Sequence, residues 1–387
     1  MGNIADIENI TKSLNDNPMF RLSLGSKELF HSNFLEFLWE QNPTAFLEML
    51  KEIVTKEKDK NQLQDLIEKI DKNKEYLKLA REKEHFDICI FHNEGNKIVY
   101  DIIIENKVKS IPYKKQLDGY VDKITQKKQT PIYVLLSLAK NFVLKKEISE
   151  SWNVVDYKAL ESAIESQYKD KSIYITDYCS LIKSLSELED ILAQNHDVQY
   201  SQTYNSLKEV RLHDLYLKQM GSIFIGELAE MIENRISKEL IDFGDEDRNN
   251  DQNRLFLSST MNNGKSTITA SILKGQSFYT IQIEGDQYRH MYNSVGIAAK
   301  SRKPNSEKID AKKLERKLKR IKYVLNFLKQ EDQFKTKIQN VINKNYCRYG
   351  NDVVYRYKKY SDDMDLLNIM ADDVTNIYDV LFSPKQK

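Results

Sequence analysis

Residues 84–91 and 97–107 form two runs of mainly β-branched, aromatic and other apolar residues, as expected of strands in a sheet buried on both faces. Between them, residues 93–96 read Asn-Glu-Gly-Asn, which predicts a hairpin turn. Residues 131–138 make a continuous apolar run, which predicts an interior parallel strand. These runs predict the centre of a sheet.

Helical spacing of apolar residues predicts the elements around that sheet. Apolar positions between Phe34 and Trp39 form a helical stripe, and Ser26 stands where the N-cap of that helix is expected. The other elements expected in this half are helices at 4–16, 43–54, 57–80, 113–127, 157–168 and 177–193, and strands at 152–156 and 172–176. This order predicts an α/β domain with a mixed central sheet flanked by helices, at residues 1–195.

The pattern changes near residues 194–197, and residues 196–387 are predicted to form a C-terminal α+β domain that binds nucleic acid or a partner. The elements expected there are a helical stretch at 198–242, a meander at 254–260, 265–273 and 277–284, a strand within 286–299, helices at 307–330 and 331–345, a strand at 346–358 and a helix at 362–382.

Composition excludes several classes of protein. With 59 Lys and Arg against 58 Asp and Glu, no overall basicity indicates nucleic-acid binding. The three cysteines fit neither a disulfide framework nor a zinc site. The acidic start lacks the features of a signal peptide, and no apolar run reaches membrane-spanning length. A soluble cytoplasmic protein with no membrane partner is expected.

Charged residues interrupt the two apolar strands where a charge is costly. Glu105 and Lys107 lie two residues apart and should point to the same face at the end of a buried strand. Asp87 lies in the preceding strand, and the predicted hairpin would bring it beside Glu105. Buried charges require a partner or a metal, so this group is the candidate site.

An Asp followed by Glu-x-Lys at the end of the next strand resembles the PD-(D/E)XK nuclease superfamily. Here Glu-Asn-Lys follows the apolar run Ile102–Ile104. Gln116 and Tyr120 are similar to the Gln-x-x-x-Tyr helix of the RecB-like and lambda-exonuclease-like branches, and residues 28–32, Glu-Leu-Phe-His-Ser, resemble a helix start in a mostly uncharacterised bacterial subgroup. The resemblance covers about residues 20–180 and implies a restriction-endonuclease-like fold.

The resemblance also implies a reaction, the hydrolysis of phosphodiester bonds, most simply in DNA, by metal-activated water. It implies Mg²⁺ or Mn²⁺ bound by Asp87, Glu105, the backbone carbonyl of Asn106 and a carboxylate from the first helix. Lys107 would position or help to deprotonate the water, and Gln116 and Tyr120 would border the metals and contact the scissile strand. Bacterial defence against foreign DNA is the role that this subgroup suggests, with a homo-oligomer or a defence-system partner as further expectations.

Several assignments keep an alternative. Glu28 and Glu36 compete for the first-helix carboxylate; Glu28 fits the Glu-x-x-His-Ser pattern, but an acidic first-turn residue also stabilises a helix dipole. His31 and Tyr120 could serve the site or simply pack, and packing is expected for His31. Asp101 shares the strand parity of Glu105, and a salt bridge is its expected role. For the whole chain, the alternatives are a non-catalytic nuclease-like binding module and a structural subunit of a larger complex.

Two features of the C-terminal half invite a nucleotide or nucleic-acid function. Residues 259–267 end like a P-loop but lack the first glycine, and Asn-Asn-Gly between alternating runs predicts a hairpin, so nucleotide binding is rejected. Basic residues are dense from Lys300 to Lys322. Aromatic and cationic residues interleave at Tyr288, Arg289, His290, Tyr292, Tyr346, Arg348, Tyr349, Tyr355, Arg356 and Tyr357. This mixture suits contacts with phosphates and bases, and a solvated helix face would have the same basic composition.

Overall fold

The computed structural model divides the chain into two compact units, residues 1–196 with 200–220 and residues 197–199 with 221–387. The boundary predicted between residues 195 and 196 falls in a stretch outside the described residues and stays a prediction. The structure describes residues 4–23, 27–108, 114–138, 150–168, 172–193, 202–236, 241–243, 255–262, 265–275, 277–285, 287–294, 298–299, 308–309, 353–359 and 365–382.

A five-stranded mixed sheet forms the centre of the first unit, with its strands in the order β1-β2-β3-β4-β5. The strands are β1 (Lys78–Lys83), β2 (Phe86–Glu94), β3 (Lys97–Lys107), β4 (Ile132–Ser137) and β5 (Trp152–Asp156). The first three strands pair antiparallel, whereas β4 runs parallel to both β3 and β5. The three parallel strands therefore place their carboxyl ends at one edge of the sheet, which includes the end of β3.

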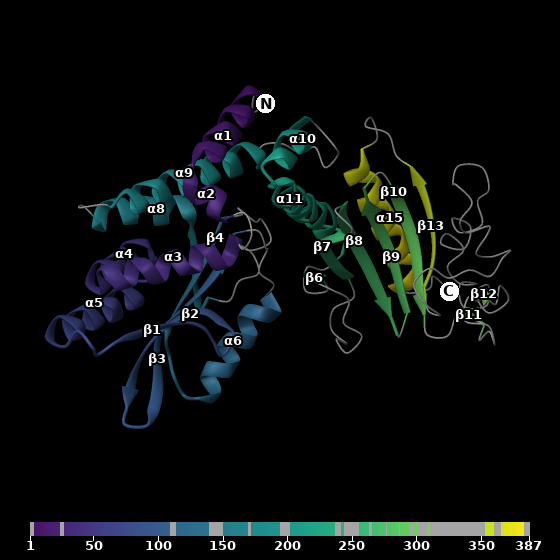
Figure 1. Ribbon diagram of the computed structural model, residues 1–387. Helices are drawn as coiled ribbons and strands as arrows, with labels where there is room; N and C mark the ends of the chain where they lie inside the picture. Colours follow the sequence, from purple (N-terminus) through teal and green to yellow (C-terminus); the bar gives the residue numbers. More distant parts are fainter. Residues whose placement is uncertain are drawn as a thin grey trace. The chain divides into compact units, whose positions relative to one another are not determined.

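Helices cover both faces of this sheet (Figure 1). The helices of this unit are α1 (Ile4–Asp16), α2 (Pro18–Ser23), α3 (Lys27–Gln41), α4 (Pro43–Ile53), α5 (Glu57–Lys72), α6 (Lys114–Gln126), α8 (Tyr157–Gln167), α9 (Ile173–Leu192) and α10 (Gln202–Glu209). On one face, Leu117 and Ile124 of α6 join a core with Ile103 and Leu135. On the other face α3 packs against β1, β2 and β3. This arrangement is consistent with the restriction-endonuclease-like fold expected from the sequence.

Two elements of the first unit differ from the prediction. The helix predicted at 57–80 ends at Lys72, and residues 78–83 form the edge strand β1 instead. Pairing with β2 therefore outweighs the helix-favouring composition Lys-Leu-Ala-Arg-Glu-Lys. The strand predicted at 172–176 is wrong, because residues 173–192 are the helix α9, which buries Ile175, Cys179 and Ile182 along one face.

The second unit is α+β and is built on a six-stranded sheet in the order β13-β10-β9-β8-β7-β6. The strands are β6 (Ile241–Phe243), β7 (Leu255–Asn262), β8 (Lys265–Lys274), β9 (Ser277–Glu284), β10 (Gln287–Ser294) and β13 (Val353–Lys359). Strands β7 to β9 form the predicted antiparallel meander, β10 is the strand predicted within residues 286–299, and β13 pairs with β10 at the edge. The helix α15 (Leu366–Phe382) packs against β8 and β9.

The remaining elements correct or limit the prediction for this half. The helical stretch predicted at 198–242 ends earlier: α11 (His213–Glu233) is followed by the strand β6. Two short strands, β11 (Ala298–Ala299) and β12 (Lys308–Ile309), pair antiparallel. Within the helix predicted at 307–330, residues 308 and 309 form β12 instead, and the rest of that range lies outside the described residues. The helix predicted at 331–345 lies entirely outside them. In the part of the chain that is described, every helix is too short or too polar to span a membrane.

Candidate active site

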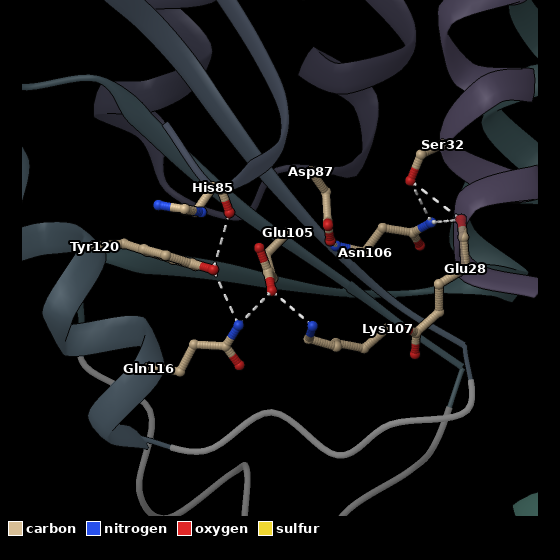
Figure 2. Close-up of polar contacts among 9 residues, drawn as sticks. All are labelled: Glu28, Ser32, His85, Asp87, Glu105, Asn106, Lys107, Gln116 and Tyr120. Atoms are coloured by element: carbon tan, nitrogen blue, oxygen red, sulfur yellow. Dashed lines mark hydrogen bonds and ion pairs between the residues drawn. The ribbon is translucent and has the colours of Figure 1, made fainter. Parts of the chain in front are cut away.

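The end of β3 presents two charged side chains on one face of the sheet and an amide on the other. Glu105, Asn106 and Lys107 are all buried, with 1%, 0% and 9% of their surfaces exposed. Lys107 Nζ lies 2.7 Å from Glu105 Oε1 (Figure 2). Register with the parallel strand β4, in which Glu105 pairs with Leu135, holds this end of β3 inside the sheet. The sequence therefore places an ion pair in a position where unpaired charges would be costly.

Asp87, near the start of β2, lies beside this pair. Its Oδ2 accepts a hydrogen bond of 2.8 Å from the backbone N–H of Asn106. The last paired residues of the two strands are Ile88 and Ile104, so Asp87 and Glu105 are the next residues along each strand. The structure thus brings together the two carboxylates and the ammonium that the sequence pattern predicts.

The electrostatics of the site favour a bound cation. Burial, and then the charge of Asp87, raise the pKa of Glu105 to about 7 despite the nearby Lys107. Burial also raises the pKa of Asp87. For Lys107, burial lowers the pKa, but the charges of Glu105, Asp87 and Glu28 outweigh it and the net shift is upward. The charge of Asp87 therefore opposes the ionisation of Glu105, and a positive charge between the two carboxylates would relieve that cost.

The helix α6 supplies the next layer of contacts, through Gln116 and Tyr120. The Nε2 of Gln116 lies 3.0 Å from Glu105 Oε1 and 3.0 Å from the Tyr120 hydroxyl. That hydroxyl donates a hydrogen bond of 3.1 Å to the backbone carbonyl of His85 (Figure 2). The ring of Tyr120 also packs against the buried core of this face, so the residue contacts both the core and the site.

Of the two candidates on α3, the structure brings Glu28 to the site and directs Glu36 elsewhere. The charge of Glu28 acts on the pKa values of Asp87, Glu105 and Lys107. Glu36 instead accepts a hydrogen bond of 2.6 Å from Arg81 Nε on β1. Ser26, the predicted N-cap of α3, lies outside the described residues.

His31 and Ser32 are structural parts of the same helix. His31 is buried, and its Nδ1 lies 3.0 Å from the Tyr178 hydroxyl, which confirms the expectation that it packs. Burial lowers the pKa of His31 to about 3, so the ring is neutral. Ser32 Oγ accepts a hydrogen bond of 3.1 Å from the Asn106 side chain.

Asp101 belongs to a different cluster, because a β-bulge interrupts the register of β2 and β3 at this point. Tyr100 and Ile103 both pack in the core on the α6 side, although they are three positions apart and regular alternation would place them on opposite faces. The bulge reverses the expected parity, and Asp101 does not share the face of Glu105. Asp101 Oδ2 lies 2.7 Å from His92 Nδ1, which confirms the expected ion pair.

The site offers oxygen ligands for a small divalent cation. Among the described residues, no three Asp, Glu, His or Cys side chains are arranged to hold a metal ion together. Mg²⁺ does not require such a set, because it retains several waters and binds one or two carboxylates. Asp87 and Glu105 supply two carboxylates, and Glu105 Oε2 is buried without a hydrogen-bond partner among the described residues. That unpartnered oxygen is what a cation ligand requires.

The aromatic and cationic side chains of β10 and β13 that the structure describes are buried, which corrects the prediction that they contact nucleic acid. Arg289 is 1% exposed and makes two bonds of 2.6 Å to Glu284. Tyr288 and His290 bond Asp373 of α15 at 2.7 and 3.0 Å. The other described members, Tyr292, Tyr355 and Tyr357, are buried as well. These residues build the core of the second unit.

The remaining candidates of this half lie partly outside the described residues. Residues 300–307 and 310–350, which contain the basic stretch as well as Tyr346, Arg348 and Tyr349, are among those not described, as is the side chain of Arg356. The role predicted for the C-terminal half in binding nucleic acid or a partner stays a prediction. The P-loop-like stretch lies at the β7–β8 hairpin, in which Asn262 pairs with Lys265. This agrees with the hairpin predicted there in place of a nucleotide-binding loop.

Sequence reasoning missed Tyr157, whose hydroxyl donates a hydrogen bond to the side-chain carbonyl of Asn106. Tyr157 begins α8 directly after the strand β5. Since parallel strands end at a common edge, the first residue after β5 is close to the end of β3. The predicted order of strands could therefore have indicated Tyr157, although the residue belongs to no sequence motif.

Comparison with known proteins gives one match. Residues 17–185 match the family model of the PD-(D/E)XK nuclease superfamily, which confirms the resemblance at the level of the superfamily. No curated protein and no solved structure matches the chain. The RecB-like or lambda-exonuclease-like branch and the bacterial subgroup stay predictions.

Proposed function

Because residues 17–185 match the family model of the PD-(D/E)XK nuclease superfamily, we propose that the chain is a metal-dependent nuclease that hydrolyses phosphodiester bonds in DNA. The observation that supports this most strongly is the convergence of Asp87, Glu105 and Lys107 at the edge of the sheet, where Glu105 Oε2 is buried and unpartnered among the described residues. A module that only binds nucleic acid has no need of two neighbouring buried carboxylates whose pKa values are both raised by burial.

In this proposal a divalent cation, Mg²⁺ or Mn²⁺, is held by Asp87, Glu105 and the backbone carbonyl of Asn106, with Glu28 as the further carboxylate. Such an ion lowers the pKa of a bound water and neutralises charge that develops on the phosphate. Asp87 and Glu105 contribute the negative charge that attracts the ion.

The chain's own residues then orient the reaction. The Lys107 ammonium, 2.7 Å from Glu105, stabilises negative charge on the phosphate and positions the attacking water. Gln116 holds Oε1 of Glu105, so that Oε2 remains available on the other side of the carboxylate. Tyr120 fixes Gln116 through its hydroxyl, and so α6 controls the orientation of Glu105.

The choice of DNA and a role in bacterial defence against foreign DNA extend the proposal from the family resemblance. The same resemblance suggests assembly with further copies of the chain or with a partner of a defence system. A panel of linear, circular and single-stranded DNA and of RNA distinguishes DNA from RNA and cutting at ends from internal cutting.

The test is cleavage of that panel by the purified chain with Mg²⁺, with Mn²⁺ and with a chelator, beside Asp87→Asn. We expect cleavage that requires the metal, stops with the chelator and is lost in Asp87→Asn. The matched control is Glu189→Gln, another buried carboxylate of the first unit, which bonds Gln219 at 2.5 Å. Folded wild-type protein that neither cleaves any substrate nor binds the metal would overturn the proposal.

A further inference from the structure

We infer that the side chain of Asn106, the middle residue of the Glu-x-Lys motif, fixes the position of Glu28 relative to Asp87 and Glu105 through bonds to Ser32 and Tyr157, and so sets the affinity of the site for its divalent cation. This inference rests on the proposed function. It assigns a positioning role to three residues whose side chains face away from the carboxylates.

The amide of Asn106 lies on the opposite face of β3 from Glu105 and Lys107, toward α3. Its Nδ2 donates to Ser32 Oγ at 3.1 Å and to the backbone carbonyl of Glu28 at 3.3 Å. Its Oδ1 accepts from the Tyr157 hydroxyl. Because the side chain is completely buried, a lost hydrogen bond could not be replaced by bulk water.

The bonds to Glu28 and Ser32 attach the first two turns of α3 to the catalytic strand. Ser32 Oγ also donates to the Glu28 carbonyl at 3.2 Å, which closes a small network of three groups (Figure 2). The residue that carries the further carboxylate is therefore bonded, through its own backbone, to the residue between Glu105 and Lys107. A movement of α3 along the sheet would break these bonds and carry the Glu28 carboxylate away.

The bond from Tyr157 holds the amide of Asn106 in one orientation. A hydroxyl that donates to Oδ1 leaves Nδ2 to face α3, so the bonds to Ser32 and Glu28 depend on Tyr157. The ring of Tyr157 meets the His31 ring edge-on at 5.4 Å, and His31 in turn bonds Tyr178 of α9. Three helices thereby hold one amide, which accounts for the adjacent His and Ser in the sequence motif at residues 28–32.

The metal site requires such precision, because the groups that orient metal ligands alter affinity when they are removed. Loss of an outer-shell partner typically weakens metal binding about 10–100-fold. Tyr157→Phe removes only the hydroxyl that orients Asn106, and it changes no residue proposed to contact the metal or the phosphate. Its effect should therefore appear first in metal binding and less in the rate at saturating metal.

The experiment titrates Mn²⁺ into full-length wild type, Tyr157→Phe, Ser32→Ala and Tyr168→Phe by calorimetry without nucleic acid, and measures the Mn²⁺ dependence of cleavage. Tyr168→Phe is the matched control, because its buried hydroxyl donates to the Leu38 carbonyl at 2.9 Å, away from the site. We expect Mn²⁺ binding to weaken about tenfold or more in Tyr157→Phe and Ser32→Ala, with cleavage largely restored at saturating Mn²⁺, and to stay unchanged in Tyr168→Phe.

The outcomes separate this inference from the proposed function. Wild-type affinity in Tyr157→Phe, or an equal loss in Tyr168→Phe, would overturn the inference while the nuclease proposal stands. If Tyr157→Phe does not fold, Ser32→Ala decides in the same way, since it removes a smaller group. Absence of Mn²⁺ binding by the folded wild-type protein would overturn both.

Discussion

Arg289 provides a quantitative test of the conclusion that the aromatic and cationic residues of β10 build a core. Its guanidinium is bonded to both oxygens of Glu284, at 2.6 Å each, and to Gln282 and Gln287 at 3.1 and 2.8 Å. The side chains of Arg289 and Glu284 are only 2% and 11% exposed. In Arg289→Met the Glu284 carboxylate would remain buried without its cation.

Removal of one member of a buried ion pair costs about 3–5 kcal/mol, because the charge left behind is not compensated. We expect Arg289→Met to lower the free energy of unfolding of the second unit by that amount. Replacement of both members by apolar residues is often close to neutral. The double variant Arg289→Met/Glu284→Leu should therefore recover most of the loss.

The assay is urea unfolding of the full chain, followed by circular dichroism and by tryptophan fluorescence. Both tryptophans, Trp39 and Trp152, lie in the first unit, so fluorescence reports that unit and circular dichroism reports both. The control is Arg235→Met, whose ion pair with Asp372 at 3.1 Å is 52% and 64% exposed. Its removal should cost less than about 1 kcal/mol.

A loss below about 1 kcal/mol in Arg289→Met would refute this reasoning. A second result would also refute it. In that result Arg289→Met has wild-type stability, but its affinity for DNA depends less steeply on salt concentration, by about the amount expected for the loss of one phosphate contact. That combination is expected of an arginine that binds the nucleic-acid backbone, which is the role first suggested by the sequence.

Three further predictions concern the first unit. As the pH decreases from about 6.5 to 3, the free energy of unfolding of this unit should fall by up to about 1.4 kcal/mol per pH unit. The reason is that His31 takes up a proton in the unfolded chain, whereas the buried ring, with a pKa of about 3, stays neutral in the folded chain. Urea unfolding of His31→Gln should not show this dependence on pH, and an unchanged dependence would contradict the prediction. Glu84 and His85 turn from β1 into β2 with φ of 55° and 74°, so the β-branched substitution His85→Val should destabilise the fold by about 1–2 kcal/mol and His85→Asn should not; equal thermal midpoints would refute this. Gln116→Met should lower the cleavage rate at least about tenfold with stability nearly unchanged, since Glu105 Oε1 then keeps only Lys107; a wild-type rate would contradict that role.

Local pattern was sufficient for the central strands and for the residues at their ends. The apolar runs of β2, β3 and β4 could be recognised because a strand buried on both faces leaves few alternatives for such sequences. The face shared by Glu105 and Lys107 followed from alternation alone. The position of Asp87 beside them followed from one hairpin turn.

The errors arose where partners distant in sequence decide local structure. Residues 78–83 have a helix-favouring composition and become a strand only because the edge of β2 is available for pairing. Asp101 lies an even number of residues from Glu105, so regular alternation would place both on one face of the strand. A β-bulge, which no residue in the sequence indicates, turns Asp101 toward His92 instead. Arg289 stands in a sequence typical of phosphate contacts, and only the fold shows that its guanidinium is already paired with Glu284.

The central claim, that the end of β3 is the active site of a nuclease, is tested most directly by cleavage with Lys107→Met beside Lys51→Met. Lys107 is buried against Glu105, whereas Lys51 forms a partly exposed pair with Glu48 at 3.3 Å on α4. The account predicts that both variants fold, that Lys51→Met cleaves at the wild-type rate, and that Lys107→Met loses about 100-fold or more at saturating Mg²⁺. Cleavage by Lys107→Met at the wild-type rate would contradict the account.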